Sequence, residues 1–239
     1  MTNLGSKQNI NNTMKKPYHT IPFSLSEESL QWLKEKTAPI VENYQLNAPL
    51  DAALIEFPRE EMKEWYNSTV WQEILAQLNP FGLQTEPIIQ FFIYKRLNKP
   101  KGDSRGNPHI DTTRGIEEFV PIRFNILLDG EENQEMVWWD IKNFMTDDRL
   151  HVVEFPRPNA PPGTTSKRIQ ARGSNMEDRW NTVGEPEYRN SSLTKFNEYA
   201  SFVRTDILHA INWDGRKPRL ILSVRYQEPW YMIERFIKD

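Results

Sequence analysis

The stretch HAINWDGRKPRLILSVRY, residues 209–226, decides the fold predicted for this chain. Its second half opens an almost unbroken apolar run, Arg219–Gln227, which is typical of a buried strand. Residues Ser201–Ile211 are also predicted to form a strand. The Asp214-Gly215 pair between the two strands is a strong hairpin signal. We therefore expect these two strands to pair antiparallel.

Elsewhere in the chain, short runs of β-branched and aromatic residues alternate with turn residues. The further strands are predicted over Ile88–Leu97, Phe119–Leu128, Met136–Ile141 and Leu150–Phe155. Two helices are predicted before them, over Ser24–Tyr44 and Arg59–Leu78. We expect both helices to pack against one sheet face. Short strands behind helices predict a mainly β fold, a jelly-roll or double-stranded β-helix of the cupin-like type.

The 239 residues are enough for one sizeable domain. Residues 1–16 are predicted to be a disordered lead-in, and residues 17–239 a single domain. Within that domain, residues 17–85 form a helical support and residues 86–230 form the double-stranded β-helix. Residues 157–196 are polar and lack clear periodicity. They are predicted to be a long inserted loop, which is usually a lid, a binding loop or partly disordered.

The composition excludes several kinds of site and partner. Cysteine is absent, so disulfides and thiolate metal sites are excluded, and a metal would be bound by His, Asp or Glu. The net charge of −3 gives no reason to expect a nucleic-acid partner, and no apolar run is long enough to cross a membrane. The start of the chain lacks the apolar core of a secretory signal, so we expect a cytoplasmic protein.

A His-x-Asp triplet and a later histidine predict a metal site. Residues two apart on a strand point to the same face, so His109 and Asp111 can bind one ion from the same side. His209, on a neighbouring strand, would complete the 2-His-1-carboxylate arrangement of non-haem Fe(II) oxygenases. The expected hairpin places His209 and Arg219 on adjacent strands, about 4.8 Å apart laterally. The guanidinium of Arg219 could there hold the far carboxylate of an acidic cosubstrate.

Simpler interpretations of the same residues stay open. His109 and Asp111 could be a hydrogen-bonded pair at the end of a loop, and His209 could be a strand histidine with satisfied hydrogen bonds. His151 is the main rival for the third ligand, because it also lies in a predicted strand. No Arg-led strand follows His151 at a similar distance, so His209 is the preferred ligand.

Taken together, these residues resemble the iron- and 2-oxoglutarate-binding set of the Fe(II)/2-oxoglutarate-dependent dioxygenases. The match is best for the aspartyl/asparaginyl and prolyl hydroxylase branches, in which an Arg-led apolar strand follows the last histidine after nine residues. The resemblance covers residues 88–227. One departure is the spacing of 98 positions from Asp111 to His209 (209 − 111), which is longer than compact members need.

The resemblance implies roles for further residues. The same branches carry an Arg-x-(Asn or His) pair on the next strand, which Arg123 and Asn125 match. They often carry a cosubstrate-contacting tyrosine before the ligand loop, which Tyr94 matches. Both matches imply contacts to the cosubstrate beside Arg219. Arg225 shares a face with Arg219 by period two and is a candidate substrate contact. No catalytic side chain beyond the metal ligands is implied.

The resemblance further implies a hydroxylase that uses Fe(II), 2-oxoglutarate and O2, and that releases succinate and CO2. A carboxylate at position 111 favours hydroxylation over halogenation. By analogy, the substrate would be of amino-acid type, either a small molecule or a peptidyl residue. Two other functions stay open: a cupin-like metal-binding protein that needs no 2-oxoglutarate, and a non-catalytic jelly-roll binding module.

Overall fold

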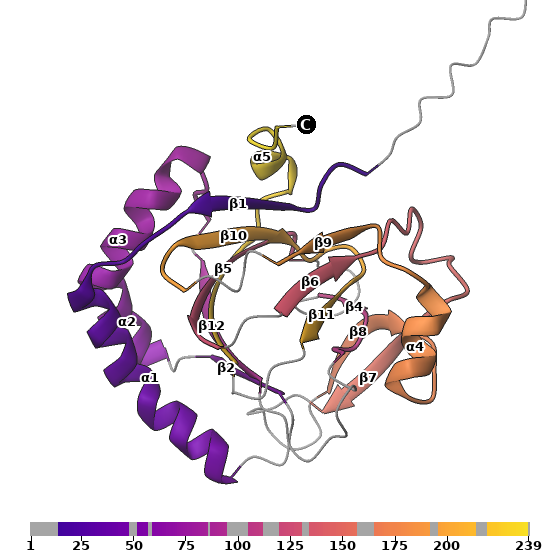
Figure 1. Ribbon diagram of the computed structural model, residues 1–239, viewed down its shortest axis with the longest axis horizontal. Coiled ribbons are helices and arrows are strands. Elements are labelled where there is room, and N and C mark those ends of the chain that lie inside the picture. Colours follow the sequence, from indigo (N-terminus) through magenta and orange to yellow (C-terminus); the bar gives the residue numbers. More distant parts are fainter. Residues whose placement is uncertain are drawn as a thin grey trace, which may run out of the picture.

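The computed structural model describes residues 14–47, 52–56, 59–85, 87–94, 105–111, 120–130, 134–156, 165–191, 196–213 and 219–238. Across these residues the chain forms two six-stranded sheets, with helices on their outer sides (Figure 1). The predicted mainly β fold class is therefore confirmed.

The first sheet, sheet I, has the strand order β1-β10-β5-β12-β3-β2, and all its neighbouring strands are antiparallel. Its strands are β1 (Tyr18–Pro22), β2 (Ala52–Glu56), β3 (Ile88–Tyr94), β5 (Ile122–Asp129), β10 (Tyr199–Arg204) and β12 (Arg219–Tyr226). Strand β12 lies between β3 and β5, and all of its residues are buried. The apolar run that opens at Arg219 is thus a central strand, as its composition predicts.

The second sheet, sheet II, has the strand order β7-β8-β4-β11-β6-β9 and is also antiparallel. Its strands are β4 (His109–Ile110), β6 (Gln134–Trp138), β7 (Leu150–Pro156), β8 (Thr165–Ala171), β9 (Tyr188–Asn190) and β11 (His209–Trp213). The short strand β4 lies between β8 and β11. Of the three predicted metal ligands, His109 therefore lies on β4 and His209 on β11 of sheet II, and Asp111 follows β4 directly.

Helices cover the outer side of each sheet (Figure 1). They are α1 (Glu27–Asn47), α2 (Arg59–Asn67), α3 (Thr69–Leu78), α4 (Met176–Val183) and α5 (Tyr231–Glu234). The second predicted helix is divided at Ser68, whose side chain accepts a hydrogen bond from the Trp71 backbone N–H at 3.1 Å and so caps α3. The prediction of one continuous helix is therefore wrong, because two helices cover these residues.

Two of the three core clusters lie on the outer sides of the sheets, toward the helices, and the third joins β6 to β10. On sheet I, Phe124 and Leu222 belong to a core cluster that also contains residues of α1, α2 and α3. On sheet II, Ile110 belongs to a cluster with Trp180 of α4. Because side chains alternate along a strand, the residues next to these point into the space between the sheets. That inner space holds buried polar side chains, among them Arg123, Ser223 and His209, beside apolar ones.

The predicted hairpin between the last two long strands is wrong. Residues predicted as one strand, 201–211, form two: β10 in sheet I and β11 in sheet II. The connection crosses between the sheets and is fixed by Thr205, whose carbonyl accepts from Asp111 N at 2.9 Å and whose hydroxyl donates to Val120 O at 2.6 Å. Arg219 accordingly lies in the opposite sheet from His209, not on an adjacent strand. The Asp214-Gly215 turn lies outside the described residues.

The prediction of a loop over residues 157–196 is wrong for the part that the structure describes. That part contains β8, α4 and β9. Strand β8 pairs with both β7 and β4, and α4 is capped by Asn175, whose side chain accepts from Asp178 N at 2.9 Å. Trp180 and Val183 of α4 are buried against sheet II. The polar composition concealed these elements because only one face of each is buried.

The region predicted as a helical support, residues 17–85, also contains strands β1 and β2. The predicted lead-in, residues 1–16, lies outside the described residues up to residue 13. No helix within the described ranges is long and apolar enough to cross a membrane.

Candidate metal centre

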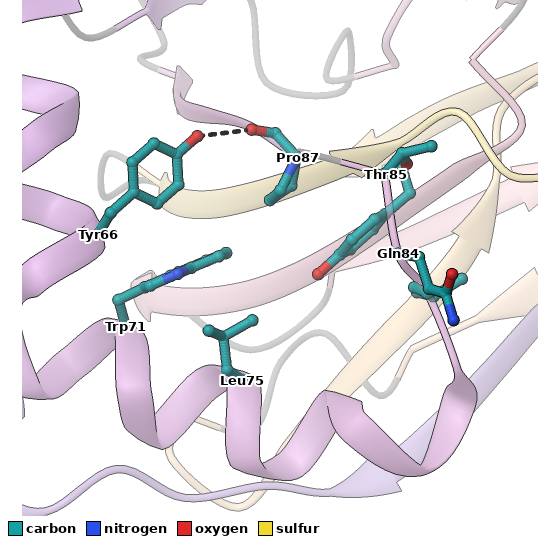
Figure 2. Close-up of a pocket in the computed structure, with 8 residues that line it drawn as sticks. Tyr66, Trp71, Leu75, Gln84, Thr85 and Pro87 are labelled. Atoms are coloured by element: carbon teal, nitrogen blue, oxygen red, sulfur yellow. Dashed lines mark hydrogen bonds between the residues drawn. The ribbon is translucent and has the colours of Figure 1, made fainter.

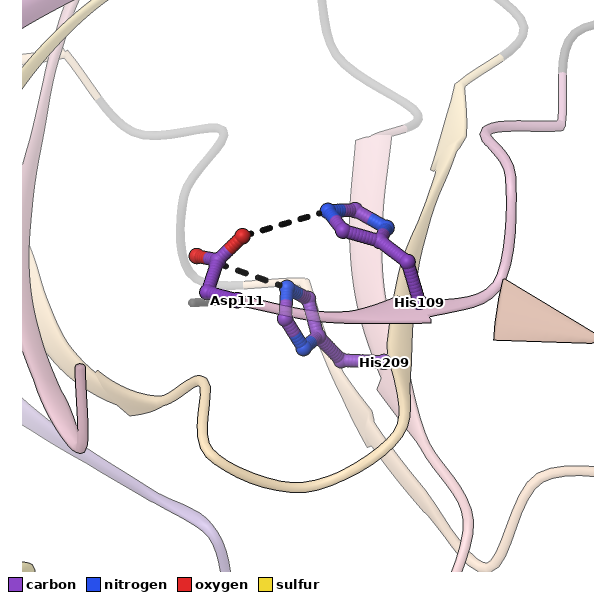
Figure 3. Close-up of side chains that lie close together, drawn as sticks. All are labelled: His109, Asp111 and His209. Carbon is purple, nitrogen blue, oxygen red and sulfur yellow. Dashed lines mark ion pairs between the residues drawn. The ribbon is translucent and has the colours of Figure 1, made fainter. Parts of the chain in front are cut away.

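The structure brings His109, Asp111 and His209 together between the two sheets (Figure 3). His109 on β4 and His209 on β11 are direct partners in the antiparallel register, and their ring centroids are 4.6 Å apart. Asp111 follows β4 immediately. Because Ile110 between them points to the outer core, both His109 and Asp111 point inward. The strand pairing and the period of two therefore converge on one site.

The distances within this group suit a metal ion. One potential ligand atom from each residue lies within 4.8 Å of the other two. His109 Nε2 is 3.3 Å from Asp111 Oδ1, and His209 Nε2 is 3.9 Å from Asp111 Oδ2. Neighbouring ligands of an octahedral ion bound at about 2.1 Å are about 3 Å apart. A small inward movement of these side chains would therefore give ligand spacing.

The orientation of both imidazoles is set by the backbone. His109 Nδ1 lies 2.7 Å from the Asn107 carbonyl, and His209 Nδ1 lies 2.9 Å from the Ile207 carbonyl. A carbonyl only accepts hydrogen bonds, so each Nδ1 carries the proton and each Nε2 presents a lone pair. Such a bond from the distal ring nitrogen is usual for metal-bound histidines.

The protonation states also suit metal binding. Burial alone would raise the pKa of Asp111, but the Arg123 cation and the two histidines outweigh it and hold the pKa well below its usual range. Burial, with a smaller effect of His109, lowers the pKa of His209 to about 3. At neutral pH the carboxylate is therefore ionised and His209 is neutral, which are the forms that bind a metal.

Arg123 contacts the predicted ligand carboxylate directly. From β5 in sheet I, its Nε donates to Asp111 Oδ2 at 2.6 Å, and its Nη1 donates to Gln90 Oε1 at 3.1 Å. Sequence reasoning had assigned Arg123 to the cosubstrate and had missed Gln90. The available signal for Gln90 was a single polar residue in the otherwise apolar strand IIQFFIY, residues 88–94.

The other predicted residues line the inner face of sheet I. Arg219, Ser223 and Arg225 alternate along β12, and Asn125 is paired with Ser223 across to β5. All four are buried, and Asn125 Oδ1 and Ser223 Oγ have no hydrogen-bond partner among the residues that the structure describes. Period two places Ser223 on the face of both arginines, but the sequence analysis assigned it no role. Tyr94 is the register partner of Arg219, and its side chain lies outside the described part of the chain.

His151, the rival third ligand, lies on β7 and is not part of the ligand group. Its pKa is lowered by burial and by nearby arginines. Within the described residues, one group of three has metal-ligand spacing, and it contains His209 instead. The structure thus favours the sequence-based preference between the two histidines.

A separate aromatic pocket of about 280 Å³ lies on the outer side of sheet I (Figure 2). Tyr66 and Trp71 form one wall, and the Tyr66 hydroxyl donates to the Pro87 carbonyl at 2.9 Å. Tyr226, which also lines the pocket, has its pKa raised by burial and therefore stays protonated. The lining contains no residue of the metal-ligand group, so this pocket is distinct from the candidate metal centre.

Comparisons with known proteins find similarity in structure. No protein-family model and no curated protein matches the chain. EvdO2 from Micromonospora carbonacea var. aurantiaca matches with a TM-score of 0.50 and 11% identity, over 89% of this chain and 87% of that chain. The non-heme alpha ketoglutarate dependent carbocyclase SnoK matches with a TM-score of 0.48 and 14% identity, over 89% and 80%. A Pseudomonas putida prolyl-4-hydroxylase matches with a TM-score of 0.42 and 11% identity, over 90% and 94%.

At 11% identity, the match to EvdO2 is a likeness of fold, and the reaction has to be argued from the site itself. The two facing antiparallel sheets are those of a double-stranded β-helix, as predicted. The fold that the motif predicted is thus confirmed.

Proposed function

We propose that this protein is an Fe(II)- and 2-oxoglutarate-dependent dioxygenase that hydroxylates an unactivated C–H bond. The observation that carries the proposal is the group of His109, Asp111 and His209, with both Nε2 atoms turned toward one carboxylate. Two imidazoles and one carboxylate on one side of an ion form the facial triad of non-haem Fe(II) oxygenases. Bound Fe(II), with 2-oxoglutarate and O2, supplies an oxidant that hydroxylates C–H bonds, leaving succinate and CO2.

The inner face of sheet I suits a dicarboxylate cosubstrate. Arg219 is almost fully buried on that face, where a guanidinium can bind a carboxylate through two hydrogen bonds. Asn125 Oδ1 and Ser223 Oγ are buried on the same face without partners in the described part of the chain, and such atoms are costly unless a ligand or water pairs with them. The amide of Asn125 can present its NH2 group instead of its oxygen after a flip. We propose Arg219, Asn125 and Ser223, with Tyr94 beside Arg219 in register, as the cosubstrate site.

An amino-acid-type substrate, free or peptidyl, fits the polar surroundings of the metal centre. Arg225 is paired in register with Arg123, whose guanidinium contacts Asp111. This register brings Arg225 close to the metal end of the inner face. A carboxylate on the substrate would find a charge-assisted partner in Arg225. We propose Arg225 as a substrate contact.

The deciding experiment is anaerobic titration of the protein with Fe(II) and 2-oxoglutarate, followed by the weak visible charge-transfer band of the chelate. We expect a band in the wild type and no band in Asp111→Ala. In Arg219→Ala we expect the band only at much higher 2-oxoglutarate concentrations. Asp147→Ala and Arg149→Ala are matched controls. These two residues form an ion pair near the surface, in which Arg149 Nη2 lies 2.8 Å from Asp147 Oδ2.

Each alternative function predicts a different result in the same titration. A cupin-like metal protein would bind Fe(II) without a 2-oxoglutarate band, and Arg219→Ala would have no effect. A non-catalytic jelly-roll module would bind no metal, and Asp111→Ala would be silent. Either result contradicts the proposal.

A further inference from the structure

We infer that Arg123 positions the carboxylate of Asp111 for the metal and is not a contact of the cosubstrate. The inference rests on the proposed metal site, and it assigns to Arg123 a different role from the one that the family resemblance implies. The two oxygens of Asp111 have different neighbours. Arg123 Nε donates to Oδ2 at 2.6 Å, and His209 Nε2 lies 3.9 Å from that oxygen, whereas Oδ1 lies 3.3 Å from His109 Nε2.

This division of the carboxylate has a chemical consequence. A carboxylate with two unengaged oxygens can rotate or bind an ion through both. A charge-assisted hydrogen bond to one oxygen holds the plane of the group and leaves the other oxygen as the ligand. Asp111 would therefore bind through Oδ1 alone. Three single-atom ligands leave the other side of an octahedral ion open for the cosubstrate and O2.

The guanidinium is fixed by a second contact. Arg123 is on β5 and Gln90 is on β3, so the side chain reaches across β12 to donate from Nη1 to Gln90 Oε1 at 3.1 Å. Arg123 is 6% exposed and Gln90 is 0% exposed. Two hydrogen bonds in different directions define the plane of the guanidinium. Gln90, Arg123 and Asp111 thus form a chain of side chains that ends at the metal site.

The two possible roles of Arg123 differ in what is lost when it is replaced. Replacing a residue that orients a metal ligand typically weakens metal binding by about 10–100-fold. A cosubstrate contact would instead contribute to 2-oxoglutarate affinity and leave the affinity for the metal alone unchanged. Metal binding in the absence of 2-oxoglutarate therefore separates the two roles.

The test uses Co(II) as an air-stable probe of the Fe(II) site, with its dissociation constant and visible ligand-field spectrum measured on full-length protein. In Arg123→Met, we expect Co(II) to bind about 10–100-fold more weakly, with an altered spectrum. At saturating Co(II), we expect the 2-oxoglutarate affinity to change less than the metal affinity. Arg219→Ala should show the reverse pattern, with Co(II) binding unchanged and 2-oxoglutarate binding weakened.

Two further variants keep the test valid if Arg123→Met does not fold. Gln90→Met leaves Arg123 in place but removes the contact that fixes its plane, so we expect a smaller loss of Co(II) affinity in the same direction. Arg123→Lys keeps the positive charge but lacks the planar guanidinium, and we expect an intermediate loss of Co(II) affinity. Circular dichroism and the unfolding midpoint of each apo variant show whether it is folded.

Three results would overturn the inference. Unchanged Co(II) affinity in folded Arg123 variants, with weakened 2-oxoglutarate binding, would make Arg123 a cosubstrate contact. Unchanged Co(II) affinity in both Gln90→Met and Arg123→Lys would mean that the hydrogen bonds from Gln90 through Arg123 to Asp111 do not position the carboxylate. A wild type that binds no Co(II) would overturn both this inference and the proposed function. A wild type that binds Co(II) but not 2-oxoglutarate overturns only the proposed function, because the metal affinities still report on Arg123.

Discussion

The two faces of sheet I differ sharply, although the same strands form both. On the outer face, Phe124 and Leu222 pack against the helices, and on the inner face their sequence neighbours Asn125 and Ser223 lie in a polar space. Sheet II repeats the arrangement, with Ile110 directed outward to α4. The usual sandwich buries its apolar core between its sheets. Here the two larger core clusters lie outside the sheets, and the space between the sheets holds polar side chains beside a small apolar cluster of Met136, Trp138 and Val203.

The largest effect is expected for Phe124→Ala, on the outer face of sheet I. Phe124 is fully buried, and its ring lies 5.4 Å from that of Phe23 and 4.7 Å from that of Phe202. We expect the free energy of unfolding to fall by about 3–5 kcal/mol, from lost burial and the cavity left behind. Urea denaturation measures it. In the fraction that stays folded, Co(II) affinity should not change, and a large loss of affinity would contradict the separation of the two faces.

A smaller effect is expected at the outer cover of sheet II. Asn175 caps α4 through the bond from Asp178 N, and α4 holds Trp180 over the sheet. Asn175→Ala should cost about 0.5–2 kcal/mol, because one terminal N–H loses its partner. Limited proteolysis of residues 172–190 should then become faster, whereas cleavage near α1 should not. Unchanged cleavage of residues 172–190 in the variant would mean that α4 opens independently of its cap.

The sequence predicted some elements of the two sheets and missed others. Period two and residue type predicted β5 and β12, because a strand buried on one or both faces has a local signature. The same rule predicted that His109 and Asp111 share a face, and the structure brings them together. The helix α4 was not predicted, because three of its first four residues, 176–179, are charged, and only its burial against sheet II reveals its apolar side.

The failures have a common physical cause, which is contact over long sequence separation. Residues 205–208 carry the chain from one sheet to the other through bonds to Val120, Pro121 and Trp139, and no local pattern distinguishes them from a continuing strand. The neighbours of Arg123 depend on the order β5-β12-β3, which follows from the whole topology. Motif spacing could therefore predict which residues face the site, but not that Arg123 contacts Asp111.

Ser223→Ala tests the inner face at the position next to Leu222. The hydroxyl is buried and has no partner within the described ranges, so its removal should leave the stability of the apo protein unchanged or raise it by up to about 1 kcal/mol. If Ser223 contacts the cosubstrate, loss of one hydrogen bond should weaken 2-oxoglutarate binding by about 2–10-fold. Calorimetric titration at saturating Co(II) measures this change. Destabilisation with unchanged 2-oxoglutarate affinity would instead make Ser223 a structural residue.

The smallest expected effect concerns acid stability of the metal-free protein. Burial lowers the pKa of His209 to about 3, against 6.5 for the exposed side chain. Between these values the unfolded chain binds more protons than the folded one, so stability rises with pH and is lost on acidification. From pH 7 to 5.5 this group should lower the free energy of unfolding by about 1 kcal/mol.

The matched variant for this prediction is His209→Gln, which removes the titrating group and keeps a polar side chain. The pKa values of His19 and His151 are also lowered by burial, but both residues are present in either protein, so the difference between the two pH profiles isolates His209. Urea denaturation with a chelator present, at several pH values, measures the profiles. The variant should be less sensitive to acid than the wild type. Parallel profiles would mean that His209 is protonated in the folded state as readily as in the unfolded chain, and the inner space would then be better hydrated than the 4% exposure of His209 implies.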